Sequence, residues 1–330
     1  MKQTLALTLA LCASLAAVTP GAGRAAMAAD QGLSITRSAP HALYADRFAY
    51  TGQVAAAEQP RLNATATTRD ASPTPQQLRV RNAVLIAGSS FLVGAYGLHK
   101  WWNDGFTGDF RTVGEDWFGQ GTPYGGADKL GHAFFAYAGT RLLTLGFEGV
   151  GNDRDRALKL GAWTTLGIMT AVEVLDGYSR QYKFSKEDAI MNVAGTAFGY
   201  LLESNPGLDR LLDFRLLYKR SAGKFDPGGD YSGQKYLLAV KASGIPALRE
   251  NPLLRYFELA AGYGTRGYES APGVERSRHL YFGISLNLSE ILGQTVFRGA
   301  SERSRAQRAT DLFFEFIQVP GTAALADHRL

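Results

Sequence analysis

The chain has 330 residues, a formal net charge of +5 and a single cysteine, Cys12. This length suits one large domain or two modest ones, and it is sufficient to bury a hydrophobic core. The charge is small and no stretch interleaves basic with aromatic residues, so the sequence argues against a nucleic-acid partner. Because Cys12 lies in an apolar N-terminal segment, we expect neither a disulfide nor thiol chemistry in the mature chain.

The N-terminus has the pattern of a secretory signal. A short basic start, "MKQ", precedes the apolar stretch "TLALTLALCASLAAV", and residues 26–28 offer a small-residue cleavage site. Residues 1–28 are therefore predicted to be a signal peptide, which places the mature protein in the cell envelope on the periplasmic side. Lipidation of Cys12 is the alternative, although Leu11 stands where a small residue is expected. Residues 29–80 are rich in Ala, Ser, Thr, Pro and Gln and predict a flexible linker.

Residues 81–220 are predicted to form a four-helix bundle rich in small residues. Each of four apolar segments is long enough for a helix that crosses such a bundle. Glycines at GxxxG spacing, such as Gly195 and Gly199, permit helices to approach closely. The segments are 82–102, about 129–149, 157–175 and 187–203.

Residues 221–330 have the alternating pattern of β-strands rather than a helical period. We predict a small antiparallel sheet in this C-terminal module, so the chain as a whole belongs to the α+β class. The candidate strands are 235–243, 255–268, 279–292 and 311–319.

The distribution of basic residues bears on which membrane the protein meets. If all four helices crossed the inner membrane after signal cleavage, the outer loops would hold more Lys and Arg than the inner loops. That arrangement reverses the positive-inside rule. We therefore expect a protein attached to the outer membrane, with the inner membrane as the alternative.

Polar residues gather at three of the predicted helix ends. In a bundle with short loops, the start of the second helix, the end of the third and the start of the fourth lie together. Within this set we take His132, Glu173 and Asp188 as candidate catalytic residues. The surrounding polar cluster is predicted to contain Asp128, Lys129, Asp176, Arg180, Ser185 and Asn192.

Three interpretations of this cluster stay open. It is a structural lock in which acids cap helices or pair with Lys129 and Arg180, a site that binds a lipid headgroup, or a catalytic or metal site. First-turn positions explain Asp128 and Asp188 but not His132, which lies one turn inside its helix. We expect residues 103–126 to cover this end, with aromatic side chains forming a lid or meeting a membrane interface. Those side chains are Trp117, Phe118 and Tyr124.

Motifs in this region resemble known families. Four motifs follow one another: "EDWF", "GGADKLGHAFF", "EVLDGYS" and "FSKEDAIMNVAG". Together they resemble the YfiM-like predicted periplasmic lipoproteins, a domain of unknown function, and more distantly the VanZ-like membrane proteins. The resemblance covers about residues 101–203 and implies a functional set without implying a reaction. A VanZ-like protein usually has Gln where this chain has Asp176. The implied set is Asp128, Lys129, His132, Glu173, Asp188, Asn192 and Gly195.

These observations lead to two hypotheses. The first is a membrane-associated envelope protein whose polar cluster stabilises the bundle or holds a headgroup; its partner is a membrane lipid or another envelope component. The second is an acid/base or metal-dependent enzyme that acts on an envelope lipid or a lipid-linked glycan. The sequence has no nucleophile elbow, zinc-protease motif or phosphate-binding loop, and it identifies no cofactor and no protein partner.

Overall fold

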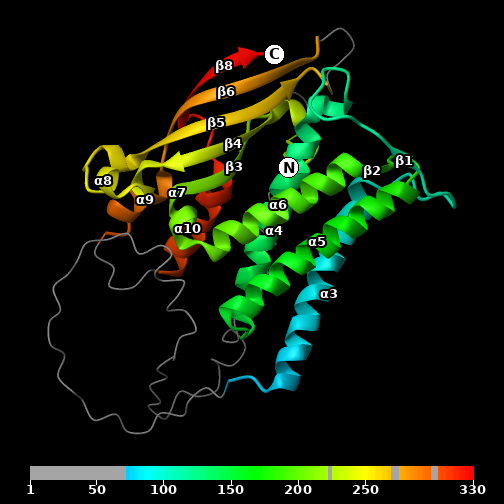
Figure 1. Cartoon of the computed structure of the whole chain (residues 1–330), viewed down its shortest axis with the longest axis horizontal. Helices are drawn as coiled ribbons and strands as arrows, with labels where there is room; N and C mark the ends of the chain where they lie inside the picture. The colour runs from blue at the N-terminus through cyan, green and yellow to red at the C-terminus, as the bar shows by residue number, and fades with distance from the viewer. Residues whose placement is uncertain (1–71, 222–224, 269–274, 299–303) are drawn as a thin grey trace.

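The structure is a computed structural model that describes residues 72–221, 225–268, 275–298 and 304–330 (Figure 1). The predicted signal peptide and residues 29–71 of the predicted linker lie outside the described residues. The described chain is α+β, as the sequence predicts. Long helices lie on one side of a twisted sheet, and short helices border the sheet (Figure 1).

Four long helices occur where apolar segments predict them. They are α3 (Pro75–Lys100), α4 (Ala127–Gly149), α5 (Arg154–Tyr178) and α6 (Lys186–Ser204). Helix α3 begins inside the region predicted as linker, because Thr74 and Gln77 form a capping box at its N-terminus. Four shorter helices accompany them, so the described chain contains eight α-helices rather than four. They are α7 (Pro206–Leu211), α8 (Pro246–Arg249), α9 (Leu288–Gln294) and α10 (Arg305–Phe316).

Small residues bring α4 into close contact with both of its helical neighbours. A side chain at Gly195 of α6 would overlap the backbone of Ala133, and one at Gly161 of α5 would meet the carbonyl oxygen of Thr140 at 2.9 Å. In α3, by contrast, a Cβ atom added at Gly88 or Gly94 would meet nothing within 4 Å. Helices α4, α5 and α6 therefore form the closely packed unit.

Helix α3 lies along α5, but the side chains of the two helices pack closely over only part of their length. An apolar cavity of about 320 Å³ separates parts of the two helices and is lined by Ile86, Val93 and Trp163 among others. The four-helix bundle predicted from the sequence is thus corrected to a three-helix core with α3 on its flank (Figure 1). Apolar composition predicts that a helix forms, but it does not determine how many neighbours cover that helix.

The main sheet contains six strands in the order β7, β3, β4, β5, β6, β8. All neighbours are antiparallel except β3 and β7, which run parallel. The strands are β3 (Leu212–Tyr218), β4 (Gln234–Lys241), β5 (Phe257–Arg266), β6 (Ser277–Leu286), β7 (Ile317–Gln318) and β8 (Ala323–Arg329). A separate parallel pair joins β1 (Thr112–Val113) to β2 (Phe184–Ser185).

The strand predictions are confirmed in part. Strands β4 and β5 occupy the predicted ranges 235–243 and 255–268, whereas 279–292 is strand only as far as Leu286 and continues into α9. The range 311–319 is wrong for most of its length, because it lies mainly in α10. Leu312 and Phe316 lie four residues apart and both face the core, a helical spacing that the run of aromatic residues conceals. Strands β3 and β8 are absent from the predictions.

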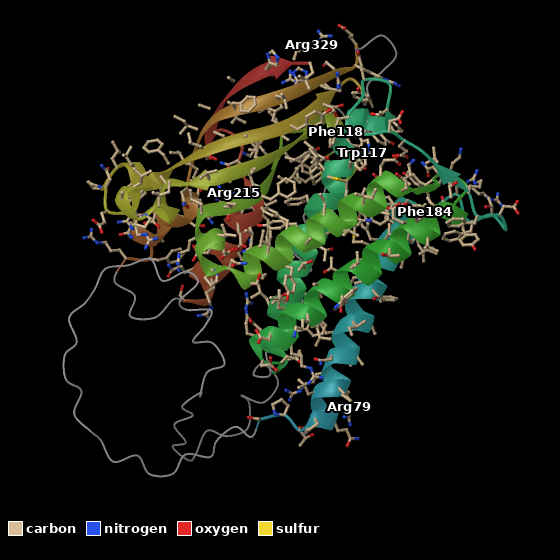
Figure 2. All side chains as sticks on the ribbon, in the orientation of Figure 1. Arg79, Trp117, Phe118, Phe184, Arg215 and Arg329 are labelled. Atoms are coloured by element: carbon tan, nitrogen blue, oxygen red, sulfur yellow. The ribbon has the colours of Figure 1, made fainter. Side chains whose placement is uncertain are left out.

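The helices and the sheet share one hydrophobic core. Its buried members come from α4, α6, β3, β4 and α10. A second, smaller cluster lies within the helical part, where Leu143, Phe147, Val150 and Ala157 pack together. Figure 2 shows Arg215 within the sheet and Arg79 at the far end of α3. The buried members are Phe134, Tyr137, Ala138, Leu142, Leu202, Leu216, Tyr236 and Phe316.

We predict that Gly195→Ala lowers the free energy of unfolding by about 3 kcal/mol, because the added methyl group overlaps the Ala133 backbone and forces α6 away from α4. Urea denaturation measures the change. The matched control is Gly94→Ala in α3, where the methyl group meets open space. There we expect a gain of about 0.5–1 kcal/mol from the better helix propensity of alanine. Equal effects of the two substitutions would contradict the close packing of α4.

Candidate functional site

The three helix ends meet as the bundle topology predicts. Helix α4 starts, α5 ends and α6 starts at one end of the three-helix unit (Figure 1). Ser185 caps α6, since its hydroxyl accepts a hydrogen bond from the backbone of Asp188 at 3.2 Å. Helix α4 is instead preceded by Gly126 at its N-cap position, with φ of 86° and no side chain to cap the helix. Capping therefore explains Ser185 and does not explain the carboxylate of Asp128.

Lys129 lies at the centre of one half of the cluster. Its side chain is 0% exposed, and its Nζ lies 3.0 Å from Glu115, 3.4 Å from Asp128 and 3.7 Å from Asp188. Burial acts to lower the pKa of Lys129, but the surrounding carboxylates outweigh it and raise the pKa above its usual value. Lys129 is thus a buried cation held in its charged form by three acids.

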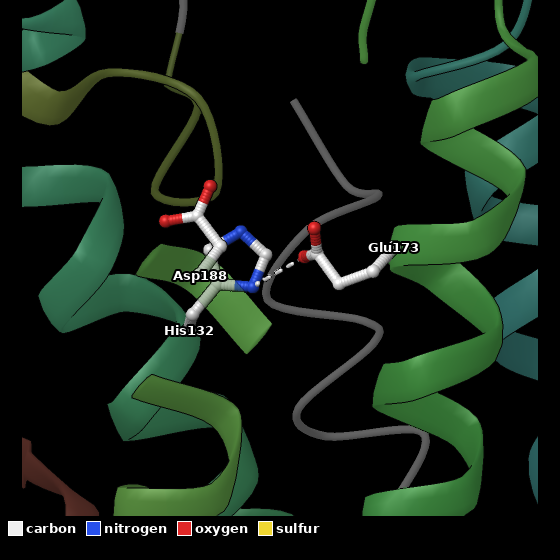
Figure 3. A group of neighbouring side chains, drawn as sticks. All are labelled: His132, Glu173 and Asp188. Carbon is white, nitrogen blue, oxygen red and sulfur yellow. Dashed lines mark ion pairs between the residues drawn. The ribbon is translucent and has the colours of Figure 1, made fainter. Parts of the chain in front are cut away.

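His132, Glu173 and Asn192 form the other half. The Nδ1 atom of His132 lies 3.2 Å from Glu173 Oε1 and 3.2 Å from Asn192 Oδ1. Figure 3 shows Glu173 extending from α5 toward the imidazole, with Asp188 beside the ring. Glu173 Oε2 accepts from the Ser185 backbone at 3.5 Å. The His132 side chain is 21% exposed and Glu173 is 2% exposed, so the imidazole is the member of this pair that reaches solvent.

The buried acids hold protons more tightly than free carboxyl groups do. Burial, followed by repulsion from Asp188 and Asp176, raises the pKa of Glu173 to about 9. Burial, followed by repulsion from Asp188, raises the pKa of Asp128 to about 7 despite the nearby Lys129. Burial also raises the pKa of Asp176 to about 6, against the hydrogen bond from Trp102. Glu173 is therefore protonated at neutral pH unless another cation takes the place of its proton.

Several oxygen atoms in the cluster have no hydrogen-bond partner among the residues that the structure describes. These atoms are Glu173 Oε1, Asp188 Oδ1 and Asp128 Oδ1, and each is buried. Buried polar atoms are usually satisfied, so three unpartnered oxygens in one cluster call for a proton, a water molecule or an ion. Glu173 Oε1 does lie 3.2 Å from His132 Nδ1, and Asp188 Oδ1 lies 3.7 Å from Lys129 Nζ, so ion pairs satisfy these two oxygens only in part.

Two predicted members of the cluster are placed differently from the rest. Asp176 accepts a hydrogen bond from the indole of Trp102 at 2.6 Å and lies beside the cluster. Arg180 is exposed and donates to the backbone of Phe106 at 3.3 Å, so it does not serve as the partner of Glu173. Helix α5 ends at Tyr178, and the next residue, Ser179, pairs with Phe106 of the covering loop.

Glu115 is the cluster residue that sequence reasoning missed. It lies in the loop before α4 and enters the cluster because the loop folds back over the helix start. Its neighbours in "GEDWF" draw attention to aromatic residues rather than to the acid. The signal that could have identified Glu115 is an acid in the loop that leads directly into the helix of Lys129.

The aromatic residues of the same loop attach it to the sheet rather than closing over His132. The rings of Phe118 and Tyr263 lie 5.3 Å apart, and those of Tyr124 and Tyr231 lie 4.3 Å apart. Trp117 is 44% exposed. Figure 2 shows Trp117 and Phe118 between the start of α4 and the strands. Over the cluster itself, the loop places the carboxylate of Glu115.

Two overlapping groups in the cluster have the composition of a metal site. His132, Glu173 and Asp188 each offer a ligand atom, and these atoms lie within 4.8 Å of one another. Glu115, Asp128 and Asp188 form a second such group, which Lys129 already occupies as a cation. The first group combines an imidazole with two carboxylates, a ligand set that suits zinc, manganese or ferrous iron.

The fold and the site together define an α+β protein with a buried acidic cluster at one end of a helical unit. Residues 114–204 are similar to a family described as predicted periplasmic lipoprotein (DUF2279), which carries no assigned reaction. The match runs from the loop before Glu115 to the end of α6, and it supports the cell envelope, on the periplasmic side, as the protein's location. Neither the curated proteins nor the solved structures give a significant match to this chain.

We predict that the metal-free protein loses stability as the pH rises between about 5 and 9. Glu173 has a pKa of about 9 in the folded protein against 4.5 ordinarily, so the folded state binds more protons across this range. Chemical denaturation in excess chelator at several pH values measures the loss. Glu173→Gln, which resembles the protonated side chain, should flatten the dependence. A variant with the same slope as the natural protein would contradict the prediction.

Proposed function

We propose that this is an outer-membrane-associated envelope protein whose helix-end cluster binds one divalent cation through His132, Glu173 and Asp188. The observation that carries the proposal is that ligand atoms of His132, Glu173 and Asp188 lie within 4.8 Å of one another. The buried oxygens Glu173 Oε1 and Asp188 Oδ1 accept no hydrogen bond among the described residues, and their charged neighbours are His132 at 3.2 Å and Lys129 at 3.7 Å. A cation placed among the three side chains would satisfy both oxygens and would balance the excess of acids.

The charges within the cluster favour a bound cation over a self-sufficient ion-pair lock. Lys129 already pairs with Glu115, Asp128 and Asp188, so Glu173 is left with a proton or with His132. Burial, followed by repulsion from Asp188 and Asp176, raises the pKa of Glu173, so its carboxyl group keeps a proton unless a cation offsets the negative charge. Metal binding displaces such protons, because a ligand must be deprotonated to coordinate.

The exposure of His132 favours a site at which the bound cation contacts a further ligand over a purely structural metal site. Three protein ligands leave coordination positions open, whereas purely structural zinc sites are closed by four. One of these ligands reaches solvent, so a polar group can approach the ion from that side. A bound divalent cation would supply a Lewis acid for the phosphate or carbonyl oxygen of an envelope lipid or lipid-linked glycan. Under this proposal, Glu115 and Lys129 hold the start of α4 in position.

Helix α3 supports association with a lipid surface. Its exposed apolar side chains include Val84, Phe91 and Leu98, which are 65%, 73% and 57% exposed. Helices α3 and α5 are both long and apolar enough to cross a membrane by length and composition, although core helices of soluble proteins meet the same criterion. We propose that the outer flank of α3 lies against the outer membrane.

We predict that the purified protein binds about one Zn²⁺ or Mn²⁺ per chain, and that His132→Ala and Glu173→Gln each weaken binding about tenfold or more. Isothermal titration and elemental analysis measure affinity and stoichiometry. Because the cation displaces the Glu173 proton, binding at pH 7 should release protons, seen by titration in two buffers of different ionisation enthalpy.

The control for this experiment is His99→Ala, which removes an exposed histidine at the end of α3. It should bind the cation like the natural protein. Unchanged affinity in both cluster variants would refute the proposed ligands. If the natural protein binds no cation and the cluster variants unfold, the cluster is a structural lock.

We predict that the protein is recovered with the outer membrane after cell fractionation, and that Val84→Asp with Phe91→Asp shifts it toward the soluble periplasmic fraction. Two charges on the exposed flank of α3 oppose contact with a lipid surface. Val296→Asp is the control, because Val296 is 68% exposed and lies just after α9, near the sheet. Recovery with the inner membrane would overturn the placement.

A further inference from the structure

A second polar arrangement lies on the sheet, within β6 and β8 and apart from the helix-end cluster. Ser277 Oγ lies 2.8 Å from His279 Nε2, and His279 Nδ1 lies 2.5 Å from Asp327 Oδ1. The imidazole thus connects a hydroxyl on one side to a carboxylate on the other. This is the order in which a serine nucleophile, a general base and an orienting acid are connected in acyl-transfer enzymes.

Strand geometry builds this arrangement. Ser277 and His279 are two residues apart on β6, so their side chains point to the same face of the sheet. Asp327 of β8 is paired with Tyr281, two residues further along β6 on that face. The diagonal spacing between neighbouring strands allows the carboxylate of Asp327 to reach His279. No loop is needed to hold the three groups together.

The imidazole is held firmly in its orientation. The rings of His279 and Tyr281 stack with centroids 6.0 Å apart and an angle of 16° between their planes. His279 is 7% exposed, whereas the Asp327 side chain is 35% exposed, so the arrangement lies at the rim of the sheet. Arg266 Nη2 lies 3.1 Å from the second oxygen of Asp327, which fixes the carboxylate from the other side.

A purely structural role explains only part of this arrangement. The contact between His279 and Asp327 joins two strands and stabilises the edge of the sheet. The contact between Ser277 and His279 lies within one strand, so it adds no tie between strands. It does place a hydroxyl on the free nitrogen of an oriented imidazole, which is what proton removal from a nucleophile requires.

Basic residues surround the three groups and indicate the charge of a ligand. Arg266 is directly paired with Ser277, and Arg329 is directly paired with His279. Lys235 of β4 pairs with Gly264 of β5, which in turn pairs with His279 of β6. The Nζ of Lys235 lies 4.0 Å from the centre of the Tyr281 ring. Arg266 also pairs with Asp327 and Arg329 with Glu275, so these three cations face two acids. The remaining positive charge would attract a substrate that carries a phosphate or carboxylate group.

We propose that Ser277, His279 and Asp327 form a serine esterase site for esters that carry an anionic group. Ser277 Oγ attacks the ester carbonyl carbon, and its proton passes to His279 Nε2. The bond to the alcohol oxygen then breaks, and the alcohol leaves with the proton from His279. Water, deprotonated by His279, cleaves the acyl-serine to give a carboxylic acid and restores Ser277. Asp327 acts as a positioning residue for the imidazole.

The test is covalent labelling by a fluorophosphonate probe, followed by intact mass and peptide mapping, in excess chelator so that the helix-end cluster is not involved. The natural protein should gain one adduct, on Ser277, and Ser277→Ala should gain none. His279→Ala should slow labelling about a hundredfold or more, because it removes the base. Asp327→Asn should slow it, while Asp327→Glu should restore part of the rate. A purely structural contact would not produce this partial recovery of the labelling rate.

Ser285→Ala provides the matched control. Ser285 lies on the same strand and the same face as Ser277, but its hydroxyl donates to Glu258 at 3.0 Å instead of to an imidazole. This variant should be labelled like the natural protein, and thermal unfolding verifies that every variant folds. A second readout is hydrolysis of p-nitrophenyl hemisuccinate against the neutral acetate, where the anionic ester should react faster and Arg329→Gln should reduce the preference. An unlabelled natural protein, or equal labelling of Ser277→Ala, overturns the proposal.

Discussion

Helix α4 is packed on several sides, and the rest of the structure depends on this constraint. Gly195 and Gly161 allow α6 and α5 to lie against its backbone, while Tyr137 and Phe134 fill the core beneath the sheet. A helix buried to this degree cannot leave a charge without a partner. Lys129 and Arg141 of this helix are almost fully buried, and each is paired with acids. Those of Lys129 are Asp128 of α4 itself, Glu115 of the preceding loop and Asp188 of α6. The partners of Arg141 are Glu203, Asp209 and Glu315, which come from α6, α7 and α10.

The sheet shows what a self-sufficient buried charge network looks like in this protein. Arg215 pairs with Asp213 and Glu258, and Lys241 pairs with Asp213. Two cations meet two acids, and none of these four side chains has a buried unpartnered atom. At the helix-end cluster, three acids surround Lys129 and a fourth, Glu173, lies against His132, while three carboxylate oxygens stay without a hydrogen bond. The contrast within one chain is the reason to treat the cluster as a cation site rather than as a second lock.

The parts of the fold and of the candidate site that could be predicted from the sequence are those that depend on local interactions. The long helices follow from apolar segments, and the meeting of His132, Glu173 and Asp188 follows from short connections between helices. The position of Glu115 in the cluster could not be predicted, because a loop that folds back shows no hydrophobic periodicity in its sequence. Strands β3 and β8 were missed for other reasons, since β3 follows a helix directly and β8 is largely exposed. Ser277, His279 and Asp327 come together only through the pairing of β6 with β8, a register that composition does not determine.

The loop before α4 physically connects the two candidate sites. Glu115 of this loop binds Lys129 in the cluster, and three residues later the carbonyl of Phe118 accepts a hydrogen bond from Arg278. Arg278 is the residue between Ser277 and His279 on β6. The start of α4 is tied to the sheet as well, because the hydroxyl of Tyr263 donates to the carbonyl of Gly125. A shift of α4 that altered the proposed cation site would therefore also move the strand that carries Ser277. The two proposed sites thus share this loop as a structural support, although their chemistry is separate.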